Sequence, residues 1–361
     1  MCRILFLIPY PLHESPSQRF RFEQYLDMLT RTGYHIKIQS FLPRGKWRIF
    51  YQPGHTVNKA FMIANGLLKR VSVLFTLNRF DRVFVHREAA PIGPPVIEWI
   101  IGRIFKRKII YDFDDAIWLT DKKNETTLEK TLRSRSKVSS ICRWSHTISC
   151  GNEYLRQYAL RFNSNAFLNP TTIDTEQVHN RALYSHAGRT GERIMITWTG
   201  SHSTLKYLYL LEAVLRGIQE KFSEVDLLVI ADKPPEMNLP RIAFKPWSNQ
   251  TEITDLAQAD IGIMPLPDDE WSKGKCGFKA LQYMALEIPA VVSNVGVNPE
   301  IIQDGKNGRL CDSTESWMWA LEELITNPER RAQLGQAGRQ TVSDYYSVSS
   351  NSENFRSILV R

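Results

Sequence analysis

Short apolar segments alternate with longer amphipathic segments, and this alternation occurs twice along the chain. An apolar run followed by a helix-sized amphipathic segment is typical of a parallel sheet that is covered by helices on both faces. The sequence therefore predicts the α/β class, with two doubly wound domains in succession. In the first series we expect helices at 18–31 and 92–105, and strands at 3–8, 35–41, 82–86, 108–111, 146–149 and 166–168.

The second series begins after residues 171–192, a polar stretch without a hydrophobic period that we interpret as a linker. A chain of 361 residues exceeds what one hydrophobic core usually serves. We therefore expect a first domain at 1–170 and a second at 171–344, with a final helix at 345–361 that packs back on the first. In the second domain we expect helices at 204–222, 252–258, 277–286 and 316–325, and strands at 194–198, 226–231, 242–244, 261–264 and 290–293.

The formal net charge of +8 indicates an anionic partner, such as a nucleotide, a phospholipid surface or nucleic acid. The basic residues are spread along the chain rather than gathered in one arm, which argues against nucleic acid. The five cysteines are widely separated and odd in number, so they fit a reducing cytoplasm better than a zinc site or a disulfide framework. No apolar run reaches the roughly 18 residues of a membrane span, so we expect any membrane contact to be peripheral.

Side chains that follow a strand are the first candidates for a site, because open parallel sheets bind ligands beyond the carboxyl ends of their strands. Asp112, Asp114 and Asp115 lie at such an end. We expect them to serve a cleft without a metal. The alternatives are that Asp112 and Asp114 hold a divalent metal, or that Asp114 or Asp115 caps the next helix. His13, His86 and His202 lie in similar positions and are candidates for catalysis, with a surface or packed position as the alternative. Arg19 and Arg21 are candidates for binding an anionic acceptor such as a lipid diphosphate, with a helix-surface role as the alternative.

Residues 271–293 form a glycine-containing loop, a helix, a proline stop and a strand. Gly274 and Gly277 precede the helix, and Lys275, Lys279 and Gln282 recur at a spacing of three and four. A helix start offers N–H groups and the positive end of a dipole, glycine allows close approach, and lysine adds charge. These features predict a diphosphate site, and the alternative is that the lysines are solvated and the glycines only form turns.

The pattern Met-Ala-x-x-x-Pro-x-Val-x-Ser at 284–293 resembles the donor-binding region of glycosyltransferase family 4. The resemblance covers most of 194–345. In the first half it rests on shorter segments, at 3–6, 15–19 and 111–116, and residues 169–170 and 173–174 resemble the hinge of these enzymes. It implies the GT-B fold of group 1 glycosyltransferases, in which two Rossmann-like domains face each other across a cleft, with the acceptor in the first and the nucleotide sugar in the second.

The resemblance also implies roles for individual residues. Lys275 and Lys279 are expected to be catalytic by stabilising the leaving diphosphate, and Asp114 and Asp115 are assigned to catalysis in the cleft, without a metal. Trp247 is expected to stack on the base, with a core position as the alternative, and Lys206 has an exposed helix position as its alternative. The expected donor-binding residues are Gly200, Ser201, His202, Lys206, Trp247, Gly277, Phe278 and Gln282.

One departure concerns the two glutamates, separated by seven intervening residues, that the family often carries. Alignment on Pro289 places Gly274 at the first position and Gln282 at the second. Gln282 can still bond a ribose hydroxyl through its carbonyl oxygen, whereas Gly274 has no side chain. Lys275 or Asp269 is expected to substitute for the first glutamate.

The expected activity is retaining transfer of a hexose or deoxyhexose from a nucleotide diphosphate sugar to a glycan or lipid-linked glycan acceptor. The expected setting is cell-surface polysaccharide synthesis in the cytoplasm, at the inner face of the plasma membrane, with no metal or other cofactor and no nucleic acid. A catalytically inactive GT-B scaffold or glycan-binding subunit is the alternative. A nicotinamide-dependent dehydrogenase is disfavoured because no G-x-G-x-x-G follows the first strand, where residues 8–12 read Ile-Pro-Tyr-Pro-Leu.

Overall fold

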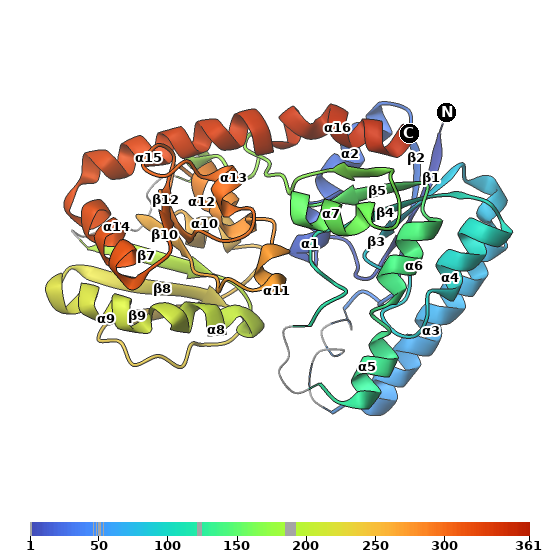
Figure 1. The fold of residues 1–361 in the computed structure, drawn as a ribbon, viewed down its shortest axis with the longest axis horizontal. Helices are drawn as coiled ribbons and strands as arrows, with labels where there is room; N and C mark the ends of the chain where they lie inside the picture. Colours follow the sequence, from blue (N-terminus) through green and yellow to red (C-terminus); the bar gives the residue numbers. More distant parts are fainter. Residues whose placement is uncertain are drawn as a thin grey trace. The chain divides into compact units, whose positions relative to one another are not determined.

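The computed structural model describes residues 2–45, 47, 49, 52, 54–120, 125–184 and 193–361. The chain divides into two compact units. The amino-terminal unit contains Met1–Thr171 and Ser352–Arg361, and the carboxy-terminal unit contains Thr172–Asn351 (Figure 1). Each unit has a six-stranded sheet in which every strand pair is parallel. The predicted α/β class with two doubly wound domains is therefore confirmed.

The sheet of the amino-terminal unit has the order β2-β1-β3-β4-β5-β6. Its centre is apolar because the central strands are covered on both faces, as a parallel sheet requires. The strands are β1 (Arg3–Ile8), β2 (His35–Ser40), β3 (Arg82–His86), β4 (Lys108–Phe113), β5 (Thr147–Cys150) and β6 (Ala166–Leu168). The helices are α1 (Pro16–Arg19), η1 (Glu23–Tyr25), α2 (Leu26–Arg31), α3 (Thr56–Leu74), η3 (Leu77–Arg79), α4 (Val96–Trp99), η4 (Ile100–Ile104), α5 (Thr127–Arg133), α6 (Lys137–Trp144) and α7 (Glu153–Leu160).

The helix expected at 18–31 is interrupted. It starts as α1, turns at residues 20–22 and resumes as η1 and α2. The interruption points Arg21 inward, where its side chain is 1% exposed. The helix expected at 92–105 begins later, at Val96, because Pro94 and Pro95 come directly before it.

The last helix, α16 (Val348–Val360), ends within the amino-terminal unit. The Phe355 ring stacks on Tyr25, with 4.5 Å between the ring centroids, and both rings are buried. The Arg82 guanidinium donates to the carbonyl oxygens of Val360 and Arg361. These contacts extend the aromatic core of Phe6, Phe22 and Phe84 under the sheet.

The sheet of the carboxy-terminal unit has the order β12-β11-β10-β7-β8-β9. Its strands are β7 (Ile194–Thr199), β8 (Val225–Ala231), β9 (Ile242–Pro246), β10 (Ile261–Met264), β11 (Ala290–Ser293) and β12 (Arg309–Cys311). Its helices are η5 (Arg181–Leu183), η6 (His202–Thr204), α8 (Leu205–Leu208), η7 (Tyr209–Leu211), α9 (Glu212–Lys221), α10 (Glu252–Leu256), α11 (Glu270–Lys273), α12 (Phe278–Ala285), α13 (Asn298–Ile301), α14 (Thr314–Thr326), α15 (Pro328–Thr341) and η8 (Val342–Tyr346).

Helix α12 is fixed on its sheet through Tyr283. The ring covers Gly262 of β10, where an added Cβ would lie 2.3 Å from the ring. Its hydroxyl accepts from the Thr199 amide at 3.2 Å and donates to the Ile263 carbonyl at 3.3 Å. The start of α12 is thereby held against the end of β7, which is where the sequence predicts the diphosphate. Among the described residues, none of the helices has the length and apolar character needed to cross a membrane.

Candidate functional site

The entry to α12 depends on a glycine. Gly277 precedes the helix with a φ of 66°, a left-handed conformation that glycine adopts without strain. A Cβ at this position would also lie 2.2 Å from Ile301 Cδ1. The chain therefore turns tightly into α12, and the first turn of the helix directs its dipole and N–H groups toward the loop.

Lys279, in the first turn of α12, lies over the Trp198 ring at the end of β7, with 5.5 Å between Nζ and the ring centroid. The same ring fills the space beside Gly200, where a Cβ would lie 2.4 Å from it. Trp198 is 1% exposed, so it is a fixed platform between the glycine and the lysine. The structure thus brings Gly200 close to Lys279 of the distant segment 277–279, with the Trp198 ring between them.

Lys275 lies in the loop before α12 rather than on the helix. Its Nζ is 4.8 Å from the centroid of the Trp271 ring. The predicted helical face with Lys275, Lys279 and Gln282 therefore does not form as one stripe. Both lysines are partly buried, and each lies against an aromatic ring rather than extending fully into solvent.

Gln282 is fully buried within the carboxy-terminal unit. Its amide Nε2 donates to Glu252 Oε1 at 3.0 Å and lies 3.3 Å from His179 Nε2. The side chain thus belongs to a polar cluster beneath the helix, and the predicted ribose contact stays a prediction. No pattern in the sequence marks Glu252, which is 2% exposed and whose carboxylate lies beside the position where the family has its second glutamate.

The remaining predicted donor residues lie at the same edge of the sheet, which carries the carboxyl ends of the adjacent strands β7, β8 and β9. His202 is held by Asp232, with 2.5 Å between Nδ1 and Oδ2, and Ser201 Oγ lies 2.9 Å from Ser203 Oγ. Trp247 follows β9 and is partly exposed, and its amide donates to the Ala231 carbonyl at 2.9 Å. Lys206 is exposed, with its Nζ 5.2 Å from the Tyr207 ring centroid.

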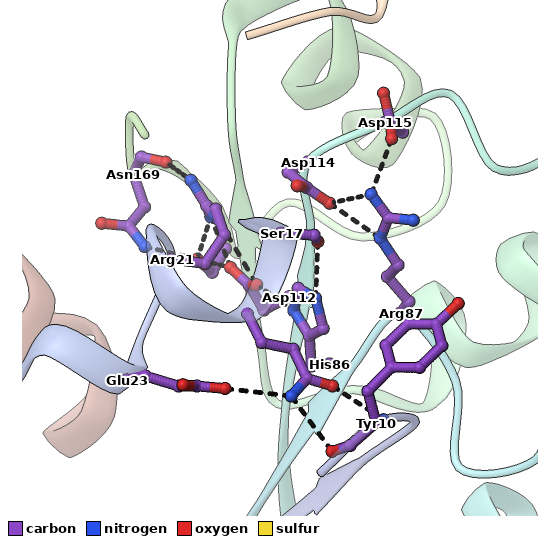
Figure 2. Close-up of polar contacts among 12 residues, drawn as sticks. Tyr10, Ser17, Arg21, Glu23, His86, Arg87, Asp112, Asp114, Asp115 and Asn169 are labelled. Atoms are coloured by element: carbon purple, nitrogen blue, oxygen red, sulfur yellow. Dashed lines mark hydrogen bonds and ion pairs between the residues drawn. The ribbon is translucent and has the colours of Figure 1, made fainter. Parts of the chain in front are cut away.

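The amino-terminal unit has a second polar site, centred on the fully buried Asp112 at the end of β4 (Figure 2). The Arg21 guanidinium forms an ion pair with the Asp112 carboxylate and also donates to the Asn169 carbonyl. Ser149 Oγ donates to Asp112 at 2.6 Å, and His86 Nδ1 lies 2.7 Å from it. Burial alone would raise the pKa of Asp112, but Arg21 and His86 together hold it well below its usual value.

His86 links this buried carboxylate to a surface hydroxyl. Its Nε2 lies 2.8 Å from Ser17 Oγ, and its other ring nitrogen faces Asp112, so the three side chains form one hydrogen-bonded chain (Figure 2). The imidazole is fully buried, whereas Ser17 is partly exposed. An ordered chain of this kind fixes the orientation of the imidazole ring, and a side-chain hydrogen bond from Ser17 to Asp114 connects it to the neighbouring carboxylates.

Asp114 and Asp115 are bound by one arginine. Arg87 Nε donates to Asp114 at 2.8 Å, and its Nη2 donates to Asp115 at 2.6 Å. Burial raises the pKa of Asp114, but the Arg87 charge outweighs it and lowers the pKa to about 2. Arg87 has a φ of 58°, an uncommon conformation for a residue with a side chain.

The helix-capping alternative for the two aspartates does not fit the described residues. The next helix, α5, begins at Thr127 and is capped by Thr126. Among residues that the structure describes, no group of three or more histidine, cysteine or acidic side chains is arranged to hold a metal ion. Of the other candidates, His13 is largely exposed and lies 3.5 Å from Glu23, and the Arg19 guanidinium lies 5.0 Å from the Phe20 ring centroid.

The chain is similar to known proteins in sequence and in fold. Residues 193–327 match the family model described as Glycosyl transferases group 1. Spore coat protein SA of Bacillus subtilis is 31% identical over 208 residues, which is 52% of this chain and 54% of that protein. The putative glycosyltransferase EpsD of the same organism is 40% identical over 67 residues, 18% of each chain. The chain thus spans about half the length of the first of these relatives and less of the second.

Solved structures match along the whole chain. Sucrose-phosphate synthase from Thermosynechococcus elongatus has a TM-score of 0.71 at 12% identity, with 99% of this chain and 98% of that chain covered. Anabaena HepE in complex with UDP and glucose has a TM-score of 0.66 at 13% identity, with 99% of each chain covered. The chain therefore has the GT-B fold of two Rossmann-like domains, and its residues 193–327 carry the sequence pattern of the group 1 glycosyltransferases.

Proposed function

We propose that this chain is a family 4 glycosyltransferase that moves a sugar from a nucleotide diphosphate sugar to a glycan or lipid-linked glycan acceptor, with retention at the anomeric carbon. The observation that carries the proposal is the position of Lys279 over Trp198, where the Gly200 turn meets the glycine-led start of α12. UDP is present in the HepE structures that share this fold.

The proposed donor site acts by electrostatic stabilisation of the leaving diphosphate. As the glycosidic bond opens, negative charge gathers on the leaving diphosphate, and a preorganised cation lowers the barrier more than it stabilises the bound donor. Lys279 supplies the charge from within the first turn of α12, and Lys275 adds a second cation from the loop before it. Trp198 holds Lys279 in place, so little reorganisation is needed when the charge develops.

The amino-terminal unit supplies groups for the acceptor. Ser17 presents a hydroxyl that is oriented by His86 and Asp112, and Asp114 and Asp115 present carboxylates that are fixed by Arg87. Sugar hydroxyls are both donors and acceptors, so hydroxyls and carboxylates are suitable partners for them. The leaving phosphate takes the acceptor proton in this proposal, which leaves the protein groups a positioning role.

We also propose that the reaction needs no metal ion and takes place at the cytoplasmic face of the plasma membrane, in cell-surface polysaccharide synthesis. Lysines and a helix start are arranged where a metal would otherwise neutralise the diphosphate. The net charge of +8 suits an anionic membrane that carries the acceptor.

One observation favours a second candidate function. Gly274 and Gln282 occupy the positions of the two family glutamates, and Gln282 is buried against Glu252. An inactive GT-B scaffold that binds the nucleotide sugar without transferring the sugar would show this combination.

A donor screen separates the two functions. A nucleotide sugar that binds the folded protein raises its melting temperature in proportion to the logarithm of its concentration over Kd. We expect one of a panel of UDP-, GDP- and dTDP-sugars to stabilise the protein and to be consumed when a glycan acceptor is added. Stabilisation without any release of nucleoside diphosphate identifies the scaffold, and no stabilisation by any nucleotide sugar contradicts both.

A further inference from the structure

Helix α3 has one buried face and one exposed apolar face. The inner face consists of Met62, Gly66, Arg70 and Val73, and Met62 packs on Phe41 and Leu42. The outer face carries an apolar series at spacings of three, four and seven, in which the exposed fraction is 82% for Val57, 73% for Phe61, 69% for Leu68, 46% for Val71 and 84% for Phe75. Scattered apolar side chains are normal on a surface, but a continuous helical face of this length is not.

The outer face continues beyond the end of α3. Arg107 Nη2 donates to Asn78 Oδ1 at 2.8 Å, which brings the end of η4 close to the end of α3. Ile104 and Phe105, which come just before Arg107, are exposed as well. The outer face is defined here as Val57, Phe61, Leu68, Val71, Phe75, Ile104 and Phe105.

The charged residues in the two segments that carry this face are all basic. No aspartate or glutamate occurs from Met28 to Phe80, or from Trp99 to Tyr111. Lysines and arginines occur in both stretches, at positions 31, 37, 44, 46, 48, 59, 69, 70, 79, 103, 106, 107 and 108. Of these, Arg79, Arg103, Lys106 and Lys108 are exposed next to the apolar side chains at the end of the face.

We propose that the outer face of α3 docks the protein on a lipid bilayer that contains anionic headgroups. An apolar helical face between cations buries its side chains at the level of the acyl chains while the cations bind the headgroups. A second copy of this chain fits less well, because the segments that carry the face contain only basic charges and two such faces would bring these cations together. The proposal rests on the proposed function only in that a lipid-linked acceptor gives the docking a purpose.

Vesicle flotation of the full chain tests the proposal. We expect binding to vesicles of phosphatidylcholine with a quarter phosphatidylglycerol, at least tenfold weaker binding to phosphatidylcholine alone, and weaker binding as salt rises. The triple variant Phe61→Ser, Leu68→Ser, Phe75→Ser should lose at least tenfold in affinity for the anionic vesicles. The double variant Leu210→Ser, Trp319→Ser is the matched control, since it removes exposed apolar side chains from the carboxy-terminal unit, and it should bind as the unaltered chain does.

Two further measurements separate a loss of vesicle binding from a loss of folding and from a failure of the transferase proposal. The triple variant should melt at the same temperature as the unaltered chain and should keep its transfer to a soluble acceptor, because its three side chains are largely exposed. Lys279→Ala should float with the vesicles normally, so a failure of the transferase proposal leaves the docking test intact. The proposal would be overturned if the triple variant bound anionic vesicles as tightly as the unaltered chain does, or if the unaltered chain bound neutral and anionic vesicles equally. It would also be overturned if the unaltered chain formed a dimer that the three substitutions dissociate.

Discussion

The two polar sites differ in how they are encoded. The proposed donor site in the carboxy-terminal unit is built around one continuous segment, from Lys275 to Lys279, with Trp198 and Gly200 as its distant contributors. The site in the amino-terminal unit joins Ser17, Arg21, His86, Asp112 and Asn169, which come from separate parts of the chain (Figure 2). The first is therefore local and partly exposed, whereas the second is a buried network on which the fold itself depends.

The largest expected effect tests whether the buried network is structural. Asp112→Ala removes the anion from a fully buried ion pair and leaves the Arg21 charge without its carboxylate. We expect a loss of about 3–5 kcal/mol in the free energy of unfolding, measured by urea denaturation of the full chain.

The double variant Arg21→Met, Asp112→Leu is the control for Asp112→Ala. It should lose less than Asp112→Ala alone, because it buries no unpaired charge. A loss below about 1 kcal/mol for Asp112→Ala would show that the network is not the support that its burial indicates.

The second effect sets the family pattern against the structure. Gln282→Glu restores the second family glutamate. In the structure, however, the Gln282 amide lies 3.0 Å from the Glu252 carboxylate, so the new carboxylate would lie directly beside that of Glu252. Two buried carboxylates raise the pKa of the pair, so the variant should lose about 2 kcal/mol of stability at pH 8 and regain part of it at pH 6, where the pair takes up a proton.

The control for Gln282→Glu is Gln282→Met, which adds no charge and should show no such pH dependence. The measurement is the urea midpoint at the two pH values, together with sugar transfer. Faster transfer by Gln282→Glu without any loss of stability would mean that the family pattern, and not the buried cluster, decides the role of this position.

The third effect separates function from stability at the donor site. Lys279→Ala should lower the turnover number at least tenfold, about 1.4 kcal/mol in the barrier, because the leaving diphosphate loses its nearest cation. The stability should change little, since Lys279 lies partly exposed on a ring that stays packed without it. Lys306→Ala, which removes an exposed lysine from the same unit, should transfer at the normal rate, and near-normal turnover of Lys279→Ala would remove this residue from the mechanism.

The same contrast explains what the sequence could and could not predict. The strands and the α12 segment were predictable because their signals are local: apolar runs, glycine before a helix and proline after it. The rule that ligands bind at strand ends also placed His86 and Asp112 at one edge of the sheet. The family pattern added the donor role, which the spacing of residues alone does not establish.

The pairing of Arg21 with Asp112 was not predictable, because an uninterrupted helix at 18–31 would leave Arg21 on a periodic face with no reason to be buried. The break after Arg19 turns this side chain inward, and the break is itself a consequence of the tertiary network. Gln282 shows the same limit. Its spacing from Lys279 suggested a shared face, but α12 is buried from Ala280 onward, so only its first turn faces outward.

The fourth effect concerns the ionised aspartate beside Arg87. The folded protein holds the pKa of Asp114 at about 2, below its usual value near 3.8. The stability that Asp114 contributes is therefore present above pH 4 and is lost as the pH falls toward 2. Asp114→Asn should make the unfolding free energy less steep in pH across this window, by about 1 kcal/mol in total. Asp268→Asn, which removes an exposed carboxylate, should leave the slope unchanged, and an equal slope in Asp114→Asn would contradict the role of the Arg87 pair.

The smallest expected effect is that of metal removal, and it bears on both sites at once. In the amino-terminal unit, Arg87 already provides a cation to Asp114 and Asp115, in the position that a divalent ion would need. In the carboxy-terminal unit, Lys275 and Lys279 are the cations assigned to the diphosphate. Sugar transfer should therefore change less than twofold when EDTA is added, whereas a loss that magnesium restores would move the aspartates from a positioning role to a metal site and Arg87 out of its ion pairs.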